Sequence, residues 1–461
     1  MRAIDRVRLF PLATAAVLCA LTAASPVFAQ GYGLYEQGSC QMGRAGAGVA
    51  NPCDDGSAMF FNPAGLALET GAVASGGVTG VAPRGTFTND TTGLVATVRH
   101  RTFPAPSAYV AVPVGSRLVA GVGLFAPYGL TMDWPSTSEG RFLSYYSSIR
   151  SMYVQPTVAY RLTDQVMVGG GIDITHTSLE LRRRVDLSTL ALTGTPLTFR
   201  QIGVPPGTDF ADVDLTGSGT HAGAHFGILV KANEKLSFGA RYLTRQHVSI
   251  GNGRLATQQI ATNQVLRVPL PGLPPGTPLD RIVQGSFASG GPLSAQNATT
   301  AIPLPDQLVL GAAVRPTPKL TLLADYQYTH WKLFDTIGIV NQFAPPTVLV
   351  ESYRDSHGIR LGAEYGLSRA IVRGGFEANS AAAPDQSVTP VLPEAPRLEY
   401  AAGLGLPFGN ARLDLAYMYV DQQDRQGRST DGGLANPTVA VNNGLFKYSA
   451  NLFSASIVVH W

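Results

Sequence analysis

Charged residues and long apolar runs are both scarce in this chain. Asp, Glu, Lys and Arg make up 14% of its 461 residues, against roughly 25% in a typical soluble protein. After the first thirty residues, no apolar run reaches the length of about 18 residues that a membrane-spanning helix needs. These absences argue against both an ordinary charged soluble domain and a helical membrane protein. They suit a chain whose apolar residues are dispersed by alternation.

Cysteine is also rare, with three residues, and the first of them lies in a segment that predicts export. Residues 1–29 have the order of a secretory signal peptide: a basic start, an apolar core and a small-x-small cleavage site before Gln30. These parts are Arg2, Arg6 and Arg8, then residues 9–24, then Val27-Phe28-Ala29. A membrane anchor is the alternative. Leu18 precedes Cys19, so lipoprotein processing is not expected.

The net charge is small as well. Removal of residues 1–29 takes three Arg and one Asp from a net charge of +3 and leaves +1, which gives no case for nucleic acid or an acidic partner. Cys40 and Cys53 remain, and in an oxidising compartment they are expected to form a disulfide, with two free thiols as the alternative. The bridge closes a loop of 14 residues, which on the chain-entropy model stabilises by roughly 3 kcal/mol.

From residue 71 onward, about ten residues of period-two alternation are followed by a break, again and again. In residues 320–328, Leu322 and Tyr326 share one face and Asp325 lies on the other. Such alternation is typical of strands with one apolar and one polar or small face. Six short turns alternate with seven long loops between the segments. The fourteen segments are 71–82, 105–114, 117–130, 148–162, 165–180, 220–232, 235–250, 306–315, 318–332, 354–367, 369–378, 397–407, 411–421 and 447–461.

This arrangement predicts an all-β fold, a 14-stranded antiparallel transmembrane β-barrel over residues 71–461 whose apolar band faces lipid. A soluble sandwich or propeller is the alternative. The last segment places Phe453, Ile457 and the C-terminal Trp461 on one face, which resembles the terminal signal read by the outer-membrane insertion machinery. The sequence thus predicts a monomer in the outer membrane, in contact with its lipid and lipopolysaccharide.

Five stretches carry a resemblance to a known family, namely Asn62-Pro63-Ala64, SSIRSMYVQPTVAYRLTDQVMVGGGIDITHTSLEL, LPDQLVLGAAVRPTPKLTLLADYQYTHWKLF, YRDSHGIRLGAEY and VRGGFEANSAAAPDQSVTPVLPEAPRLEYAAGLGL. In this order along the chain, they resemble the FadL-type family of outer-membrane transporters. That family takes up long-chain fatty acids and other hydrophobic compounds, and includes an aromatic-hydrocarbon branch. Its barrel has fourteen strands, the number that alternation gives here.

Residues 30–70 are rich in Gly and Ala and show neither a helix period nor a strand alternation. The resemblance implies that they form a hatch inside the barrel, with Asn62, Pro63, Ala64 and Gly65 as its motif. Small residues and tight turns suit a plug that must fit a fixed lumen. A disordered leader is the alternative, although the aromatic residues of this segment are poor choices for a disordered tail.

The third predicted strand is interrupted at Ala126, Pro127, Tyr128 and Gly129. Pro127 cannot donate to a strand ladder, and Gly129 weakens a strand interior. In the resembled family an inward kink in strand three opens the barrel wall sideways to lipid, so the resemblance implies a lateral opening here. The alternative is that Pro127 ends the strand near the surface.

Arg182 and Arg183 follow the fifth predicted strand, and Arg183 falls about where the family carries an arginine that binds the fatty-acid head group. Guanidinium–carboxylate pairing is the natural contact. The alternative is a charge cluster that faces solvent or lipopolysaccharide. Leu349 and Ala126 lie near the positions of a lysine and a serine that assist in some relatives, which leaves neutral hydrocarbons open as substrates.

The predicted loop 251–305 contains VLRVPLPGLPPGTPLDRIV, which is rich in Leu, Val and Pro for an exposed loop. With the loop 181–219 it corresponds to the family's third and fourth extracellular loops, which shape an outer groove. It is a candidate first capture surface for an apolar solute. A loop that merely packs on its neighbour is the alternative.

No motif for catalysis is found. The chain has no His-Glu-x-x-His and no Gly-x-Ser-x-Gly, and residues 43–48 have the wrong glycine spacing for a dinucleotide fingerprint. His221 and His225 share one strand face without a third ligand nearby in sequence, so they are expected to line the lumen rather than bind metal. The sequence predicts no enzyme and no cofactor. The competing classes are an adhesin or structural barrel and a general polar porin, which a plug argues against.

Overall fold

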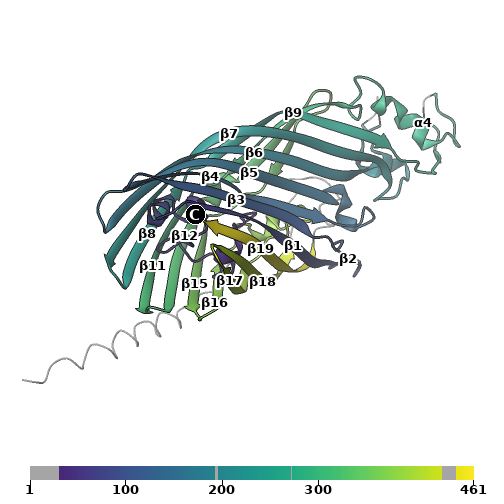
Figure 1. Ribbon diagram of the computed structural model, residues 1–461. Coiled ribbons are helices and arrows are strands. Elements are labelled where there is room, and N and C mark those ends of the chain that lie inside the picture. The colour runs from purple at the N-terminus through teal and green to yellow at the C-terminus, as the bar shows by residue number, and fades with distance from the viewer. Residues whose placement is uncertain (1–30, 193–195, 271, 428–442) are drawn as a thin grey trace, which may run out of the picture.

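The computed structural model describes residues 31–192, 196–270, 272–427 and 443–461, so the predicted signal peptide lies outside the described residues. Long strands wrap into a tilted barrel, with short turns at one end and long loops at the other (Figure 1). The wall strands are β1 (Val73–Asn89), β3 (Phe103–Val114), β4 (Leu118–Asp133), β5 (Tyr146–Arg161), β6 (Val166–Asp186), β7 (Asp209–Asn233), β8 (Leu236–Leu243), β11 (Gln307–Thr317), β12 (Leu320–Thr329), β15 (Ser356–Gly366), β16 (Ile371–Asn379), β17 (Arg397–Phe408), β18 (Ala411–Gly427) and β19 (Gly444–His460).

Each wall strand pairs antiparallel with the next one along the chain, and β1 pairs with β19 to close the ring. The closing ladder runs from Val73 opposite His460 to Asn89 opposite Gly444. Closure satisfies the backbone hydrogen bonds of both edge strands, which a lipid environment requires. The fourteen-stranded antiparallel barrel predicted from alternation is confirmed.

Five further strands and several short helices complete the described chain. β9 and β10 pair with each other beyond the ends of β8 and β11, and β13 and β14 form a hairpin above the wall. The strands are β2 (Val95–Thr97), β9 (Gln246–Gln259), β10 (Gln296–Leu304), β13 (Thr336–Asn341) and β14 (Thr347–Val350). The helices are α2 (Ser39–Met42), α3 (Ala58–Phe61), η1 (Pro63–Leu68), η2 (Glu139–Phe142), η3 (Leu187–Thr189), η4 (Phe199–Ile202), α4 (Leu279–Val283), η5 (Gln284–Phe287), η6 (Trp331–Leu333) and η7 (Asp385–Ser387). In the part of the chain that is described, no helix is long and apolar enough to cross a bilayer.

The strands run further toward the long-loop end than the alternation predicts. β1 continues to Asn89 instead of ending near residue 82, and β7 begins at Asp209 instead of near residue 220. The predicted loop 251–305 holds part of β9 and all of β10. The predicted strand ends were wrong because the wall there extends beyond the apolar band that contacts lipid. Both strand faces then become polar, and the sequence contrast fades while the backbone ladder continues.

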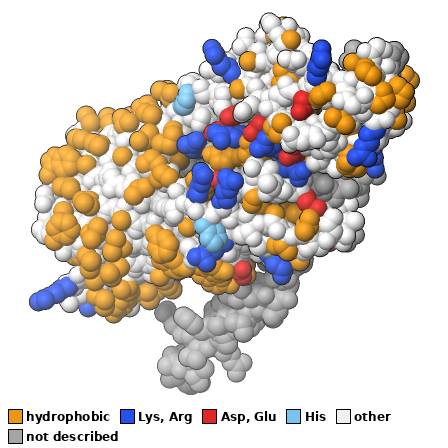
Figure 2. Space-filling model, turned by 90° about the vertical axis from the view of Figure 1, so that its right-hand side faces the viewer, with side chains coloured by type: hydrophobic (Ala, Val, Ile, Leu, Met, Phe, Trp, Pro, Cys, Tyr) orange, Lys and Arg blue, Asp and Glu red, His pale blue; other side chains and the backbone are white. Residues whose placement is uncertain are grey.

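The two faces of the wall differ in chemistry as the alternation requires. Outward side chains in the band are apolar and exposed, among them Val154, Ile172, Phe226, Leu361 and Phe453. Inward side chains at the same levels are polar and buried, among them Gln155, Asp173, Gln307, Asp325 and Glu377. Hydrophobic side chains gather over the left-hand part of the molecule, away from the loops, in Figure 2.

Candidate functional site

The N-terminal segment, defined as residues 31–68, lies inside the barrel and is almost wholly buried. The predicted motif residue Asn62 fixes it in two directions. Its Nδ2 donates to the Val49 carbonyl at 2.6 Å and to the Ile228 carbonyl of β7 at 3.0 Å, and its Oδ1 accepts from the Ala64 N–H at 3.1 Å. Asn62 therefore caps η1 and also ties it to the wall.

Backbone and wall approach each other closely along this motif. A Cβ added to Gly65 would lie 2.3 Å from Cγ of Pro52. A Cβ added to Gly169 of β6 would lie 2.4 Å from the carbonyl carbon of Pro63. Neither distance is sterically possible, so Gly65 is required for packing within the N-terminal segment and Gly169 for the approach of the segment to the wall.

Buried charged side chains of the wall also hold the N-terminal segment. Oδ2 of Asp325 on β12 accepts the N–H groups of Gly48 at 2.7 Å and Val49 at 3.0 Å. The guanidinium of Arg360 on β15 lies 4.4 Å from the centre of the Tyr35 ring. Hydrogen bonds to an ionised acceptor and cation–π contacts are both strengthened where water is excluded.

The two cysteines lie together in the N-terminal segment. Cys40 and Cys53 form a disulfide, and both are buried. Nη2 of Arg44 lies 2.9 Å from Sγ of Cys53 and donates to Oε1 of Gln41 at 2.8 Å. The bridge joins α2 to the chain before α3 and so restricts the unfolding of this part of the segment.

Strand β4 has a bulge at the predicted interruption. Its ladder with β5 shifts register between Phe125 and Tyr128, which leaves Ala126 and Pro127 without partners on β5. Its ladder with β3 runs only from Leu118 to Leu124. From Phe125 onward, β4 therefore faces a gap where β3 should continue.

The N-terminal segment supplies hydrogen bonds that β4 loses at this gap. The N–H of Leu34 donates to the Pro127 carbonyl at 2.8 Å, and the N–H of Gly129 donates to the Tyr32 carbonyl at 2.9 Å. The Gln37 side chain donates to the Ala126 carbonyl at 2.8 Å and accepts its N–H at 2.9 Å. The backbone of β4 is thus satisfied from inside the barrel rather than from β3.

The other side of the gap is the first part of β3. Residues 103–107 pair with β1 on one side and have no partner on β4. Pro104 and Pro106 lie in this stretch, and proline has no N–H to leave unpaired at an open edge. The sequence prediction missed this signal, because it considered only the interruption in β4.

A cavity of about 610 Å³ passes through the gap. Phe103, Pro104 and Met152 line its outer part, and Tyr448 and Leu452 line its inner part. Tyr32, Leu130, Ile149 and Leu392 line this cavity and also a smaller apolar pocket toward the long loops, which Ile302, Phe334, Ile339 and Leu349 complete. A mostly apolar surface, with Glu36, Glu394 and Arg397 among its polar residues, therefore leads from the long-loop end to the side of the barrel.

Comparison with known proteins agrees with this geometry. The profile of a family described as outer membrane protein transport protein (OMPP1/FadL/TodX) matches residues 20–459. The chain belongs to this family. Its members are outer-membrane transport proteins rather than enzymes, and this protein is accordingly an outer-membrane barrel. The resemblance inferred from the sequence is confirmed.

Individual members of the FadL/TodX family are distant in sequence. The chain is 22% identical to the long-chain fatty acid transport protein of Escherichia coli O6:H1, over 93% of this chain and 94% of the relative. It is 23% identical to outer membrane protein P1 of Haemophilus influenzae, over 89% of each. Among solved structures, a FadL homologue of Pseudomonas aeruginosa matches with a TM-score of 0.76 at 17% identity, covering 93% of this chain and 99% of the other. The toluene transporter TodX of P. putida matches with 0.68 at 15%, covering 94% and 99%. These structural matches establish the fold.

Outer-membrane barrels have short periplasmic turns and longer extracellular loops, so the long-loop end is taken as extracellular and the short-turn end as periplasmic. The extracellular loops of this member pack on one another. The apolar stretch 265–283 contributes Leu266, Leu279 and Val283 to a small core with Phe199 and Phe210. Val265 and Val268 remain exposed. The predicted capture surface is thus largely occupied by contacts between the loops, around α4 in Figure 1.

The two candidate arginines of this family member lie in different surroundings. Arg182 forms ion pairs with Glu180 and with Asp214, the latter at 3.3 Å. Arg183 lies on the opposite strand face, the one that carries Leu179 and Leu181, both of which line the smaller apolar pocket. Among the residues that the structure describes, Arg183 has no carboxylate partner. Arg183 lies one position of that face beyond Leu181 and is not among the residues that line the pocket.

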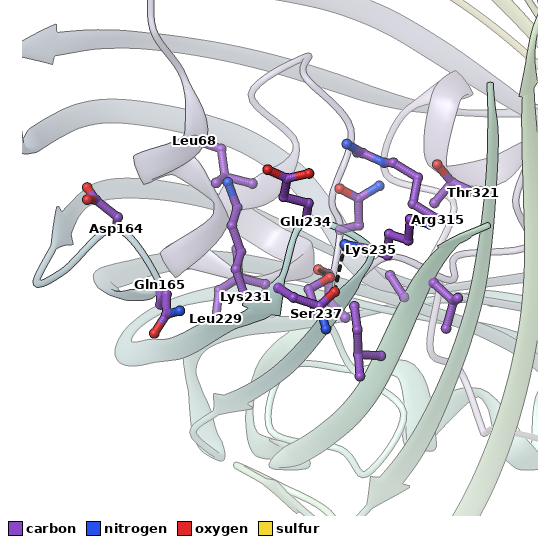
Figure 3. Close-up of a pocket in the computed structure, with 16 residues that line it drawn as sticks. Leu68, Asp164, Gln165, Leu229, Lys231, Glu234, Lys235, Ser237, Arg315 and Thr321 are labelled. Atoms are coloured by element: carbon purple, nitrogen blue, oxygen red, sulfur yellow. Dashed lines mark hydrogen bonds between the residues drawn. The ribbon is translucent and has the colours of Figure 1, made fainter. Parts of the chain in front are cut away.

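The periplasmic end presents a different lining. A hollow of about 600 Å³ lies between the N-terminal segment and the wall, and Lys231, Lys235 and Arg315 point into it beside Glu234 (Figure 3). Oγ of Ser237 donates to the Ala50 carbonyl there at 2.8 Å. This hollow is polar and charged, so an apolar solute gains less from entering it than from the cavity at the gap.

Proposed function

We propose that this protein takes up long-chain fatty acids or similar hydrophobic compounds passively and releases them sideways into the membrane. The N-terminal segment, with residues 30–70 as the hatch, blocks the direct path to the periplasm. The observation that carries the proposal is the apolar cavity that passes through the unpaired stretch between β3 and β4. Signal-peptide removal at residue 29 and a monomeric barrel are part of the same proposal.

Physical chemistry favours this route. Burial of each CH₂ gains about 0.8 kcal/mol, so a dozen methylenes gain roughly 10 kcal/mol on leaving water. The bilayer interior is as apolar as the cavity, so a chain that moves from one to the other through the gap loses little. No energy source is needed beyond the concentration gradient.

Uptake assays test the proposal and choose the substrate. A strain that lacks the gene is compared with the same strain expressing the protein, with labelled oleate in one arm and labelled toluene in the other. Protein-dependent uptake of oleate supports the fatty-acid proposal, and uptake of toluene alone supports the hydrocarbon alternative. Uptake of neither contradicts transport of hydrophobic compounds and favours an adhesin or structural barrel.

Replacement of Arg183 by alanine is expected to weaken oleate binding by about tenfold or more, because a charge-assisted hydrogen bond to the carboxylate is lost. Binding of a neutral hydrocarbon should not change. Arg182→Ala serves as the matched control, since Arg182 is engaged with Glu180 and Asp214. Binding is measured on purified protein by displacement of a fluorescent fatty acid. Equal loss in both variants would contradict the assignment.

Fatty-acid binding should also weaken as the pH rises through about 7. Glu351, in the loop after β14, lines the smaller apolar pocket, and burial raises its pKa from 4.5 to about 7. The folded state therefore binds this proton more tightly than the unfolded state. Its stabilising contribution is fully present below pH 4.5 and is lost as the pH rises through about 7. Above that pH, a Glu351 carboxylate repels the ionised head group of the ligand.

The measurement is the affinity for oleate at about pH 6 and about pH 8, on either side of the raised pKa. The Glu351→Gln variant should show no such change between the two conditions. A wild-type affinity that is independent of pH, or a variant that keeps the full dependence, would rule out this role for Glu351.

A further inference from the structure

The outer face of the wall changes from apolar to polar along a sharp line on β5 and β6. On β5 the exposed Val154 is followed toward the extracellular end by Met152 and then by Arg150. On β6 the exposed Ile174 is followed by His176, and the register places His176 opposite Met152. Because the apolar band faces the lipid chains, this line marks the level of the lipid head groups.

A hollow of about 310 Å³ lies directly above this line. Arg150 of β5 lines one side and Arg254 of β9 lines the other. Between them, apart from Leu179 and Gly217, the lining is made of small hydroxyl and amide side chains and one carboxylate. These residues are Ser148, Ser178, Glu180, Thr216, Ser218 and Asn252.

We infer that this hollow binds the phosphorylated disaccharide head group of lipopolysaccharide, the principal lipid of the outer leaflet in which the barrel lies. Guanidinium groups match phosphate in charge and in bidentate geometry. Hydroxyl and amide side chains match the hydroxyl and amide groups of the sugars. The inference concerns the outer wall and does not depend on which solute the protein transports.

The spacing of the two arginines fits this head group. Arg150 pairs opposite Ser178, Ser178 pairs opposite Ser218, and Arg254 lies on β9 opposite Thr216. The two arginines are thus three strands apart, roughly 14 Å between backbones. The lipid carries one phosphate at each end of its disaccharide, so one guanidinium can meet each phosphate while the sugars lie over the hydroxyl-lined floor.

The charge balance of the hollow also favours an anion. Its one carboxylate, Glu180, is already engaged with Arg182. Within the described residues, neither Arg150 nor Arg254 has an ion pair. More generally, Figure 2 shows basic side chains gathered between the hydrophobic surface and the loops. Two guanidinium groups without ion pairs, at the level of the lipid head groups, are suited to bind an anion.

The position of the hollow links this lipid to the gap in the wall. Arg150 and Ser178 line the hollow and also the outer part of the cavity at the gap. A lipid whose phosphate is held by Arg150 places its acyl chains along Met152 and Val154, beside the place where the cavity opens. The bound lipid would therefore form part of the border of the opening.

Binding to the purified, delipidated, full-length mature protein tests the inference. The probes are bisphosphorylated lipid A, the same lipid after enzymatic removal of both phosphates, and inorganic phosphate, with bound molecules counted by native mass spectrometry. Wild-type protein should retain lipid A, and Arg150→Ala or Arg254→Ala should each weaken retention about tenfold, with a larger loss in the double variant. Arg281→Ala, an exposed extracellular arginine on α4, is the matched control and should behave as wild type.

Three other results would overturn the inference. Equal binding of phosphorylated and dephosphorylated lipid shows that the acyl chains alone bind. Tight binding of inorganic phosphate without lipid A shows a site for the free anion. Unchanged retention in the double variant shows that the hollow is not the site. Heat-modifiable migration on gels confirms that each variant is folded. If the double variant does not fold, lipid A retention by the two single variants decides the outcome.

Discussion

Deletion of Pro127 is expected to reduce uptake of the hydrophobic substrate by about tenfold or more, because removal of the one extra residue abolishes the bulge. The β4–β5 ladder skips Ala126 and Pro127 on β4 but only Met152 on β5, so β4 carries one extra residue here. Without Pro127 the rest of β4 keeps its register with β5, and its other edge becomes available to β3. The gap narrows and the apolar cavity no longer reaches the lipid.

Labelled uptake in a strain that lacks the gene measures this effect, and heat-modifiable migration shows that the barrel is folded. Deletion of Thr137 in the loop after β4 is the matched control, because it removes one residue without changing the ladder. Full uptake by the folded Pro127 deletion variant would mean that the solute leaves elsewhere, and the polar periplasmic hollow would then need to be reconsidered.

The Arg360→Met variant is expected to lower the free energy of unfolding by about 3–5 kcal/mol, because it leaves a buried carboxylate without its partner. Nη2 of Arg360 lies 2.7 Å from Oε1 of Glu377, and both side chains are at most 2% exposed. Nη1 donates to Oε1 of Gln327 at 2.7 Å, and the guanidinium also covers Tyr35 of the N-terminal segment. The variant should therefore loosen the plug as well as the wall.

Urea unfolding followed by tryptophan fluorescence measures the change in stability, and the entry of a large polar antibiotic into cells reports on the plug. Arg360→Met combined with Glu377→Gln should recover much of the stability, because no buried charge is then left unpaired. Arg315→Met at the periplasmic rim is the control and should change stability by about 0.5 kcal/mol or less. A loss in the double variant as large as in the single one would show that packing against Tyr35, rather than the charge pair, is what matters.

The sequence predicts the wall well because each strand of a lipid-facing barrel alternates apolar residues on its outer face with polar or small residues on its inner face. Leu322 and Tyr326 point outward and Asp325 inward, as expected. The signal ends where the wall rises above the lipid, since nothing there requires one face to be apolar. That is why the ends of β1 and β7 and the whole of β10 escaped prediction.

The site was only partly accessible to prediction. Pro127 and Gly129 mark the irregular strand, because each disturbs a ladder by its own chemistry. The contribution of Tyr32 and Leu34, which bond to β4 from inside, depends on a tertiary contact that no local pattern encodes. The same holds for the pairing of Arg182 with Asp214, a residue on the next wall strand. Before folding, nothing distinguishes Arg182 from its neighbour Arg183.

The bridge between Cys40 and Cys53 has a mechanical consequence. Both of its ends lie in the N-terminal segment, and neither lies in the wall. The bridge therefore stiffens the N-terminal segment without adding a covalent link to the wall beyond the chain that leads from Leu68 into β1. Away from that connection, non-covalent contacts such as those of Asp325 and Asn62 resist its displacement. An arriving solute that competes for the contacts of Tyr32 and Leu34 can displace this first part of the N-terminal segment, while the part closed by the disulfide keeps its shape.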